Sequence, residues 1–148
     1  MRLQSCKIFA TLVLFAALAV AGNHHQLNGT WALTPAASDF GGEPAIETGT
    51  VTINDRERNI TVTRTFSYDG PNQSSSYSFT VDGRENATVR DGKSFKTKAK
   101  WDDDVLSVTT VDNGVTTVER FTLGPDNTMK LVVNRGDHHP RTLVFHRQ

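Results

Sequence analysis

Hydrophobic and polar positions alternate along most of the chain after residue 49. In segment 95–101, FKTKAKW, every second residue is a lysine, and the residues between the lysines are Phe, Thr, Ala and Trp. Because successive side chains of a strand point to opposite faces of a sheet, this segment predicts a strand with one wet and one buried face. Segments 77–81 and 142–146 alternate in the same way. The predicted sheet therefore has one apolar face.

Short clusters of Gly, Pro, Asn and Asp interrupt this pattern about every 8 to 12 residues, as turns do between strands. No window after residue 21 has the spacing of an amphipathic helix, so we expect at most one helical turn, at Thr34–Ala37. The segments between the clusters predict ten strands: Thr30–Thr34, Thr50–Asn54, Asn59–Tyr68, Ser74–Val81, Arg84–Val89, Ser94–Trp101, Val105–Val111, Val115–Leu123, Thr128–Asn134 and Arg141–Arg147.

The connections between these strands are of hairpin length, which favours an up-and-down arrangement. A twisted sheet of this many strands tends to curl and close on itself. The predicted fold class is therefore all-β, a single antiparallel up-and-down β-barrel of about ten strands. A two-sheet sandwich is the alternative, but a Greek-key sandwich needs a long crossover that the sequence lacks.

The N-terminal segment has the features of a signal peptide. Arg2 and Lys7 give it a positive start, an uncharged apolar run follows, and Ala19–Ala21 reads as a small-x-small cleavage site. The apolar run is shorter than the roughly 20 residues that span a bilayer. We therefore expect a cleaved signal peptide at residues 1–21 and a barrel domain at residues 22–148. The mature protein would be secreted or periplasmic, without stable membrane insertion.

Charge and cysteine content narrow the partners further. The chain has 16 basic and 16 acidic residues, so no basic field is expected to attract nucleic acid. Cys6 is the only cysteine and lies within the predicted signal peptide, so the mature domain cannot form an internal disulfide. Its stability must come from burial and from the hydrogen bonds of the sheet, and a closed ladder would leave no exposed edge.

A short motif at the start of the first predicted strand resembles a known family. Segment Asn28–Leu33 reads NGTWAL and contains Gly-x-Trp. It resembles the opening of the calycin superfamily, in which lipocalins and fatty-acid-binding proteins begin the barrel with this motif. The resemblance implies that Gly29 and Trp31 close one barrel end and that a basic residue of the last strand, here Arg147, packs over the indole ring. Strand number and spacing from residue 59 onward are similar to those of the ten-stranded fatty-acid-binding branch.

The sequence departs from that branch in two places. Segment Pro35–Gly49 is short and rich in Gly and Pro, so we expect no helical lid. The inward Arg-x-Tyr pair that holds a carboxylate in the family is matched here by Leu143 and Phe145. Arg120 lies where the family has another inward arginine. The opposite orientation of its strand would instead place Phe121 and Leu123 inside and Arg120 in solvent. Both orientations remain open.

The resemblance implies a monomeric lipocalin-like protein that binds a small apolar or amphipathic ligand in the barrel lumen. Side chains expected to line that lumen are Phe66, Tyr77, Phe79, Phe95, Trp101, Arg120 and Met129. The alternative is a secreted interaction or inhibitor protein with a barrel filled by its own side chains, acting through its loops.

Patterns for catalysis, metals and cofactors are missing from the sequence. It has no Gly-x-Ser-x-Gly elbow and no Gly-rich phosphate loop, so we expect neither an enzyme nor a cofactor. The pairs His24-His25 and His138-His139, with His146, lack a third ligand at a defined spacing, so we expect no specific metal site.

Overall fold

The computed structural model describes residues 24–148, which form ten antiparallel strands and two short 3-10 helices. The predicted signal peptide, with Cys6, lies outside the described residues. The helices are η1 (His24–Leu27) and η2 (Pro35–Ala37). The strands are β1 (Gly29–Leu33), β2 (Thr48–Arg56), β3 (Asn59–Ser67), β4 (Gln73–Thr80), β5 (Glu85–Arg90), β6 (Lys93–Asp102), β7 (Val105–Asp112), β8 (Val115–Leu123), β9 (Thr128–Arg135) and β10 (Arg141–Arg147).

All ten predicted strands are present, and each boundary lies within two residues of the expected one. The turns explain this agreement. Asp91 and Gly92 have φ values of 52° and 75°, and Asn113 and Gly114 have 49° and 78°. Two consecutive residues with positive φ form the tight hairpin turn that Asp-Gly and Asn-Gly favour. Between β1 and β2 the described chain contains the 3-10 turn η2 and no α-helix. The sequence predicted this absence of a helical lid.

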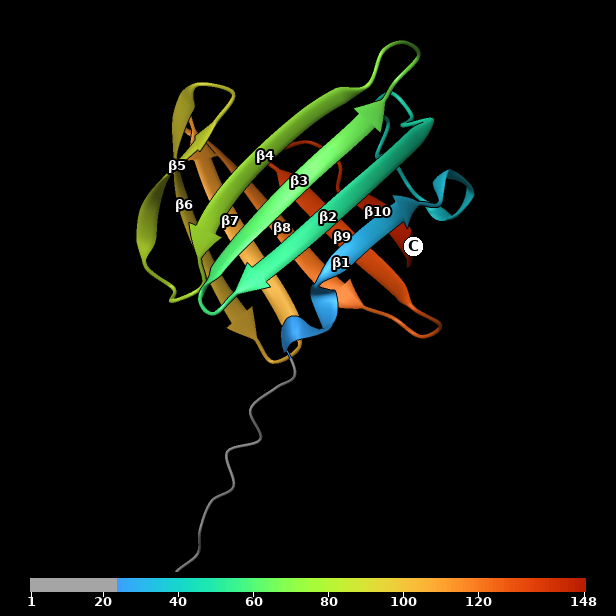
Figure 1. The fold of residues 1–148 in the computed structure, drawn as a ribbon. Helices are drawn as coiled ribbons and strands as arrows, with labels where there is room; N and C mark the ends of the chain where they lie inside the picture. Colours follow the sequence, from blue (N-terminus) through green and yellow to red (C-terminus); the bar gives the residue numbers. More distant parts are fainter. Residues whose placement is uncertain (1–23) are drawn as a thin grey trace, which may run out of the picture.

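The strands form one sheet in the order β4-β3-β2-β1-β10-β9-β8-β7-β6-β5. Strand β1 joins the two halves of the chain, because it pairs with β2 on one side and with β10 on the other. Figure 1 shows the sheet curling so that β2 to β4 lie in front of β7 and β8. The described residues form an all-β, nearly closed antiparallel barrel. Its strands are connected without a long crossover, as expected for an up-and-down fold.

Closure is incomplete at one seam, between β4 and β5. These strands stand at opposite ends of the sheet order and share no backbone ladder. Side chains bridge them instead: Thr88 Oγ1 donates to the Ser78 carbonyl at 3.0 Å, and Asn86 Nδ2 donates to Thr80 Oγ1 at 3.0 Å. The expectation of a fully closed ladder is thus corrected to a barrel with nine laddered junctions in its sheet order and one side-chain seam.

Large apolar side chains fill much of the barrel interior. They come from every second position of the strands, which points inward. The positions between them point outward and are often polar and exposed, as are the lysines of β6. We call the following fully buried group the apolar plug: Trp31, Phe79, Leu106, Phe121, Met129 and Phe145. Burying side chains of this size stabilises the fold by about 1.5–3 kcal/mol each, so the plug is a main source of stability in a domain without disulfides.

Trp31 anchors the plug where η1 meets the barrel. Its Nε1 donates to the Leu27 carbonyl at 2.9 Å, and the Arg147 guanidinium carbon lies 4.2 Å from the centre of its rings. Gly29 makes this contact possible. It has a φ of 129°, and a Cβ there would lie 2.7 Å from Arg147 Nη1. The structure therefore contains the packing of Arg147 over Trp31 that the sequence motif predicted.

Within residues 24–148, no helix is long and apolar enough to cross a membrane.

Candidate ligand-binding site

The barrel interior is hollow on the side away from the plug. Two adjoining hollows, of about 420 Å³ and about 210 Å³, share five lining residues and together form what we call the arginine pocket. The shared residues are Arg64, Arg90, Glu119, Val133 and Arg141. The larger hollow alone falls in the 300–1,000 Å³ range typical of small-molecule sites.

A hydrogen-bonded triad from three strands lies at the base of this pocket. Arg64 on β3 places its Nη1 2.7 Å from Oε1 of Glu119 on β8. Tyr77 on β4 donates its hydroxyl hydrogen to Glu119 Oε2 at 2.8 Å and accepts from Arg64 Nη2 at 2.5 Å. The side chains of Arg64 and Glu119 are only 14% and 8% exposed. An arginine and a tyrosine thus hold a carboxylate that the protein itself supplies.

The triad perturbs the protonation of its members. Burial alone would raise the pKa of Glu119, but the Arg64 charge and the hydrogen bonds from Arg64 and Tyr77 hold that pKa below its usual range. Burial raises the pKa of the Tyr77 hydroxyl, and the negative charge of Glu119 raises it further. For Arg64, burial opposes the charge, but Glu119 and Tyr77 outweigh it and raise the pKa. At neutral pH the triad is therefore an arginine cation, a glutamate anion and a neutral tyrosine.

Arg90 spans the seam above this triad. Its guanidinium carbon lies 4.8 Å from the ring centre of Phe95 on β6 and 5.5 Å from that of Tyr77 on β4. These contacts fit cation–π interactions, which fall within about 6 Å of the ring centroid. Arg90 therefore brings a positive charge to the pocket while it covers two aromatic rings.

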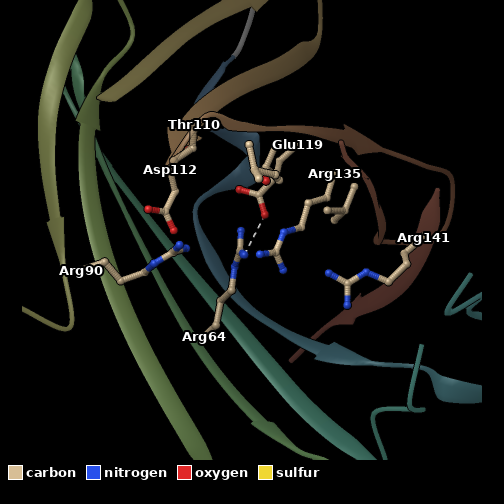
Figure 2. Close-up of a pocket in the computed structure, with 10 residues that line it drawn as sticks. Arg64, Arg90, Thr110, Asp112, Glu119, Arg135 and Arg141 are labelled. Atoms are coloured by element: carbon tan, nitrogen blue, oxygen red, sulfur yellow. Dashed lines mark ion pairs between the residues drawn. The ribbon is translucent and has the colours of Figure 1, made fainter. Parts of the chain in front are cut away.

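Two further arginines enter the pocket from β9 and β10. Arg141 pairs with Val133, and Arg135 lies two residues further along the same face of β9, so the two arginines are diagonal neighbours. Figure 2 shows the guanidinium groups of Arg64, Arg135 and Arg141 turned toward a common space beside Glu119. The ion pairs and hydrogen bonds of the described residues give neither Arg135 nor Arg141 a side-chain partner.

The larger hollow also has an apolar side. Ile46, from the segment between β1 and β2, is buried there, and Phe66, Leu131 and Leu143 line the same hollow. The segment that carries Ile46 is held to the β9–β10 turn, where His138 Nδ1 lies 3.0 Å from Glu43 Oε1. The pocket thus offers an apolar wall and a cationic wall to one guest.

The predicted lining residues lie in three different places. Phe66 lines the pocket, and Tyr77 belongs to the triad at its base. Phe79 and Met129 are fully buried in the plug, and neither borders the pocket. Phe95 is buried beneath Arg90, while half-buried Trp101 packs against the core. The expected lining is corrected accordingly: alternation identifies inward side chains but not which of them face a hollow.

Arg120 is exposed, on the outer face of β8. Its neighbours Glu119 and Phe121 are the buried, inward residues, so the strand has the parity that places Arg120 in solvent. The physical reason is burial of the large Phe121 ring in the plug. The prediction that Arg120 lines the lumen is therefore wrong. The inward charged residue of this part of β8 is Glu119, which carries the opposite charge.

Sequence reasoning missed most of the arginine pocket. Arg64, Arg90, Arg135 and Arg141 lie at strand positions where an inward charge looks like a break in the apolar face. A signal was available in β3, because Arg64 shares its parity with Ile60 and Val62, which are buried. An inward arginine flanked by such residues needs an acidic partner, and Glu119 is a buried acid.

The side chains of His24 and His25 lie outside the described ones, whereas His138, His139 and His146 lie in the described part of the chain. No group of three or more His, Cys, Asp or Glu side chains there could hold a metal ion. His138 contacts Glu43 instead.

Comparison by sequence finds no matching family model and no match among curated proteins. Solved structures do match. A Schistosoma mansoni fatty-acid-binding protein in complex with arachidonic acid has a TM-score of 0.65 and 24% identity over 86% of this chain and 99% of its own. The REP1-NXSQ fatty acid transporter has a TM-score of 0.63 and 18% identity, over 82% of this chain and 96% of its own. A secretory abundant heat soluble protein from Ramazzottius varieornatus has a TM-score of 0.63 and 13% identity, over 83% and 96%.

These similarities establish the fold. The described residues have the same fold as these proteins, a nearly closed ten-stranded antiparallel barrel, without α-helices in residues 24–148. The interior of this barrel carries the arginine pocket, with Glu119 at its base.

Proposed function

We propose that this protein binds a small apolar or amphipathic molecule in the arginine pocket. The observation that carries the proposal is the larger hollow of about 420 Å³, bordered by apolar and by charged side chains, beside a filled plug. Solved proteins of the same fold include fatty-acid-binding and fatty-acid-transport proteins, which supports a small hydrophobic guest. We propose a binding role without catalysis, because those neighbours are described as binding or transport proteins.

Titration with a neutral fluorescent probe tests the proposal. N-phenyl-1-naphthylamine gains fluorescence in apolar surroundings, and we expect saturable enhancement with one probe per protein. Native mass spectrometry of protein purified from its own host should show a co-purifying small molecule. An empty protein that leaves the probe dark would contradict the proposal and favour an interaction protein that acts through its loops.

Export is a second part of the proposal. The positive start, apolar run and small-x-small site at the N-terminus support cleavage after Ala21 and a secreted or periplasmic monomer. Intact mass of the protein from culture medium or periplasm, with size-exclusion chromatography, tests it. A mass that retains residues 1–21 would contradict it.

A further inference from the structure

We infer that the arginine pocket selects a compact organic monoanion, such as an aromatic or short-chain carboxylate or sulfonate. Its head group would lie on Arg135 and Arg141 and its apolar part against Ile46, Phe66 and Leu143. This inference rests on the proposed function, because it names the class of guest for the same pocket.

The charge balance of the pocket supports an anionic head group. The residues that line the two hollows include four arginines and three carboxylates, Asp91, Asp112 and Glu119, which leaves one positive charge in excess. The triad already neutralises Arg64 with Glu119. The excess positive charge therefore belongs to the arginines at the rim, and a monoanion would balance it.

The placement of Arg135 and Arg141 supports a shared oxyanion. Register puts them diagonally across β9 and β10 on the inward face, a separation that long side chains bridge. Guanidinium groups present forked donors that match the oxygens of a carboxylate or sulfonate. Two neighbouring cations without an acidic side-chain partner repel each other, and an anion between them would remove that cost.

The plug limits the size of the guest. Phe79, Phe121, Met129 and Phe145 are at most 1% exposed, and they occupy the barrel interior beyond the triad. A long acyl chain would have to displace them. The guest is therefore confined to the hollows, and its apolar part meets the wall formed by Ile46, Phe66 and Leu143.

Paired probes test the head group. 8-Anilino-1-naphthalenesulfonate carries a sulfonate that its neutral relative N-phenyl-1-naphthylamine lacks. We expect Arg135→Gln and Arg141→Gln each to weaken sulfonate binding by about tenfold, the loss expected for one charge-assisted hydrogen bond. Binding of the neutral probe should stay within about twofold, because apolar burial carries it. Arg120→Gln is the matched control: it removes an exposed arginine from the same barrel and should change neither affinity.

A fatty-acid series tests the size limit. Displacement of the sulfonate probe by octanoate and by stearate should give similar affinities. An open lumen would instead gain about fourfold per added methylene. Stearate binding much tighter than octanoate would overturn the compact guest.

The outcomes separate the two proposals. If the neutral probe binds while the sulfonate probe does not, or if the Arg135 and Arg141 variants match the Arg120 control, the anion site is wrong and the binding pocket stands. If neither probe binds, the proposed function itself is wrong. Inorganic sulfate alone should not compete at equal concentration, because it lacks the apolar part; equal competition would reassign the site to a free inorganic anion.

Discussion

Arg64 and Glu119 form a buried ion pair across the barrel interior, with Nη1 and Oε1 2.7 Å apart and the Tyr77 hydroxyl bonded to both side chains. The pair joins β3 to β8, strands that are not neighbours in the sheet. The ion pair connects opposite walls of the barrel, between the apolar plug and the arginine pocket.

Removing the negative charge of this pair should be costly. We expect Glu119→Gln to lower the free energy of unfolding by about 3 kcal/mol, because it leaves a buried arginine uncompensated. Urea denaturation at pH 7 measures the change. The exposed pair Lys96–Glu85 provides the control, since Glu85→Gln should cost less than about 1 kcal/mol. Equal losses of stability in the two variants would show that the buried ion pair does not stabilise the barrel more than an exposed one.

The depressed pKa of Glu119 predicts a pH dependence of stability. A carboxyl whose pKa is lower in the folded protein contributes stability fully above its unfolded pKa, near 4.3, and loses it as the pH falls toward the folded value. We therefore expect the wild type to lose stability below about pH 4.3 more steeply than Glu119→Gln. Urea midpoints between pH 2 and pH 7 measure both curves. Parallel curves would contradict the assignment.

Two buried threonines near the seam should respond oppositely to the same substitution. Thr88 donates to the Ser78 carbonyl across the seam, so Thr88→Val should cost about 1 kcal/mol and speed amide exchange along β4 and β5. Thr97 on β6 is also buried, but its hydroxyl has no partner among the described residues. Thr97→Val should be neutral or stabilise by up to about 1 kcal/mol. Thermal unfolding and hydrogen exchange give both results, and equal losses would mean that the Thr88 bond does not hold the seam.

The plug gives a prediction that links stability to guest size. We expect Phe121→Ala to lower the free energy of unfolding by about 3–5 kcal/mol, since it removes a fully buried ring from the core. It should also lengthen the lumen and so favour stearate over octanoate. Denaturation and the displacement series measure the two effects. Val111→Ala, on the exposed outer face of β7, should change stability by less than about 0.5 kcal/mol and leave chain-length preference unchanged.

The closure of the barrel end is testable at Arg147. We expect Arg147→Ala to cost about 2 kcal/mol, because the guanidinium covers the Trp31 ring and donates to the carbonyls of Asn28 and Gln26. Trp31 fluorescence should shift as the ring gains contact with water. Arg120→Ala should leave both quantities unchanged. Probe binding in the arginine pocket should also persist, which separates closure from ligand recognition.

The strands and turns could be predicted from the sequence because they depend on local chemistry. Alternation gave the faces of β6, and Asp91-Gly92 and Asn113-Gly114 gave hairpins at the right positions. The Gly-x-Trp motif gave the contact between Trp31 and Arg147.

The interior could not be predicted in the same way. Whether an inward ring fills the plug, like Phe79, or borders a hollow, like Phe66, depends on which side chains meet across the barrel. The Arg64–Glu119 pair joins residues 55 positions apart on strands that are not adjacent, so no local pattern marks it. Arg135 and Arg141 are diagonal neighbours on paired strands, but they meet Arg64 and Arg90 only after the sheet curls.

The pairing of β1 with β10 has a consequence for how the protein is made. Trp31 in the first strand opposes Arg147 in the last strand. The first strand cannot complete its hydrogen bonds until the last strand has been synthesised. Contacts between such distant positions also slow folding. A product that lacks β10 would therefore leave one edge of β1 without a partner strand.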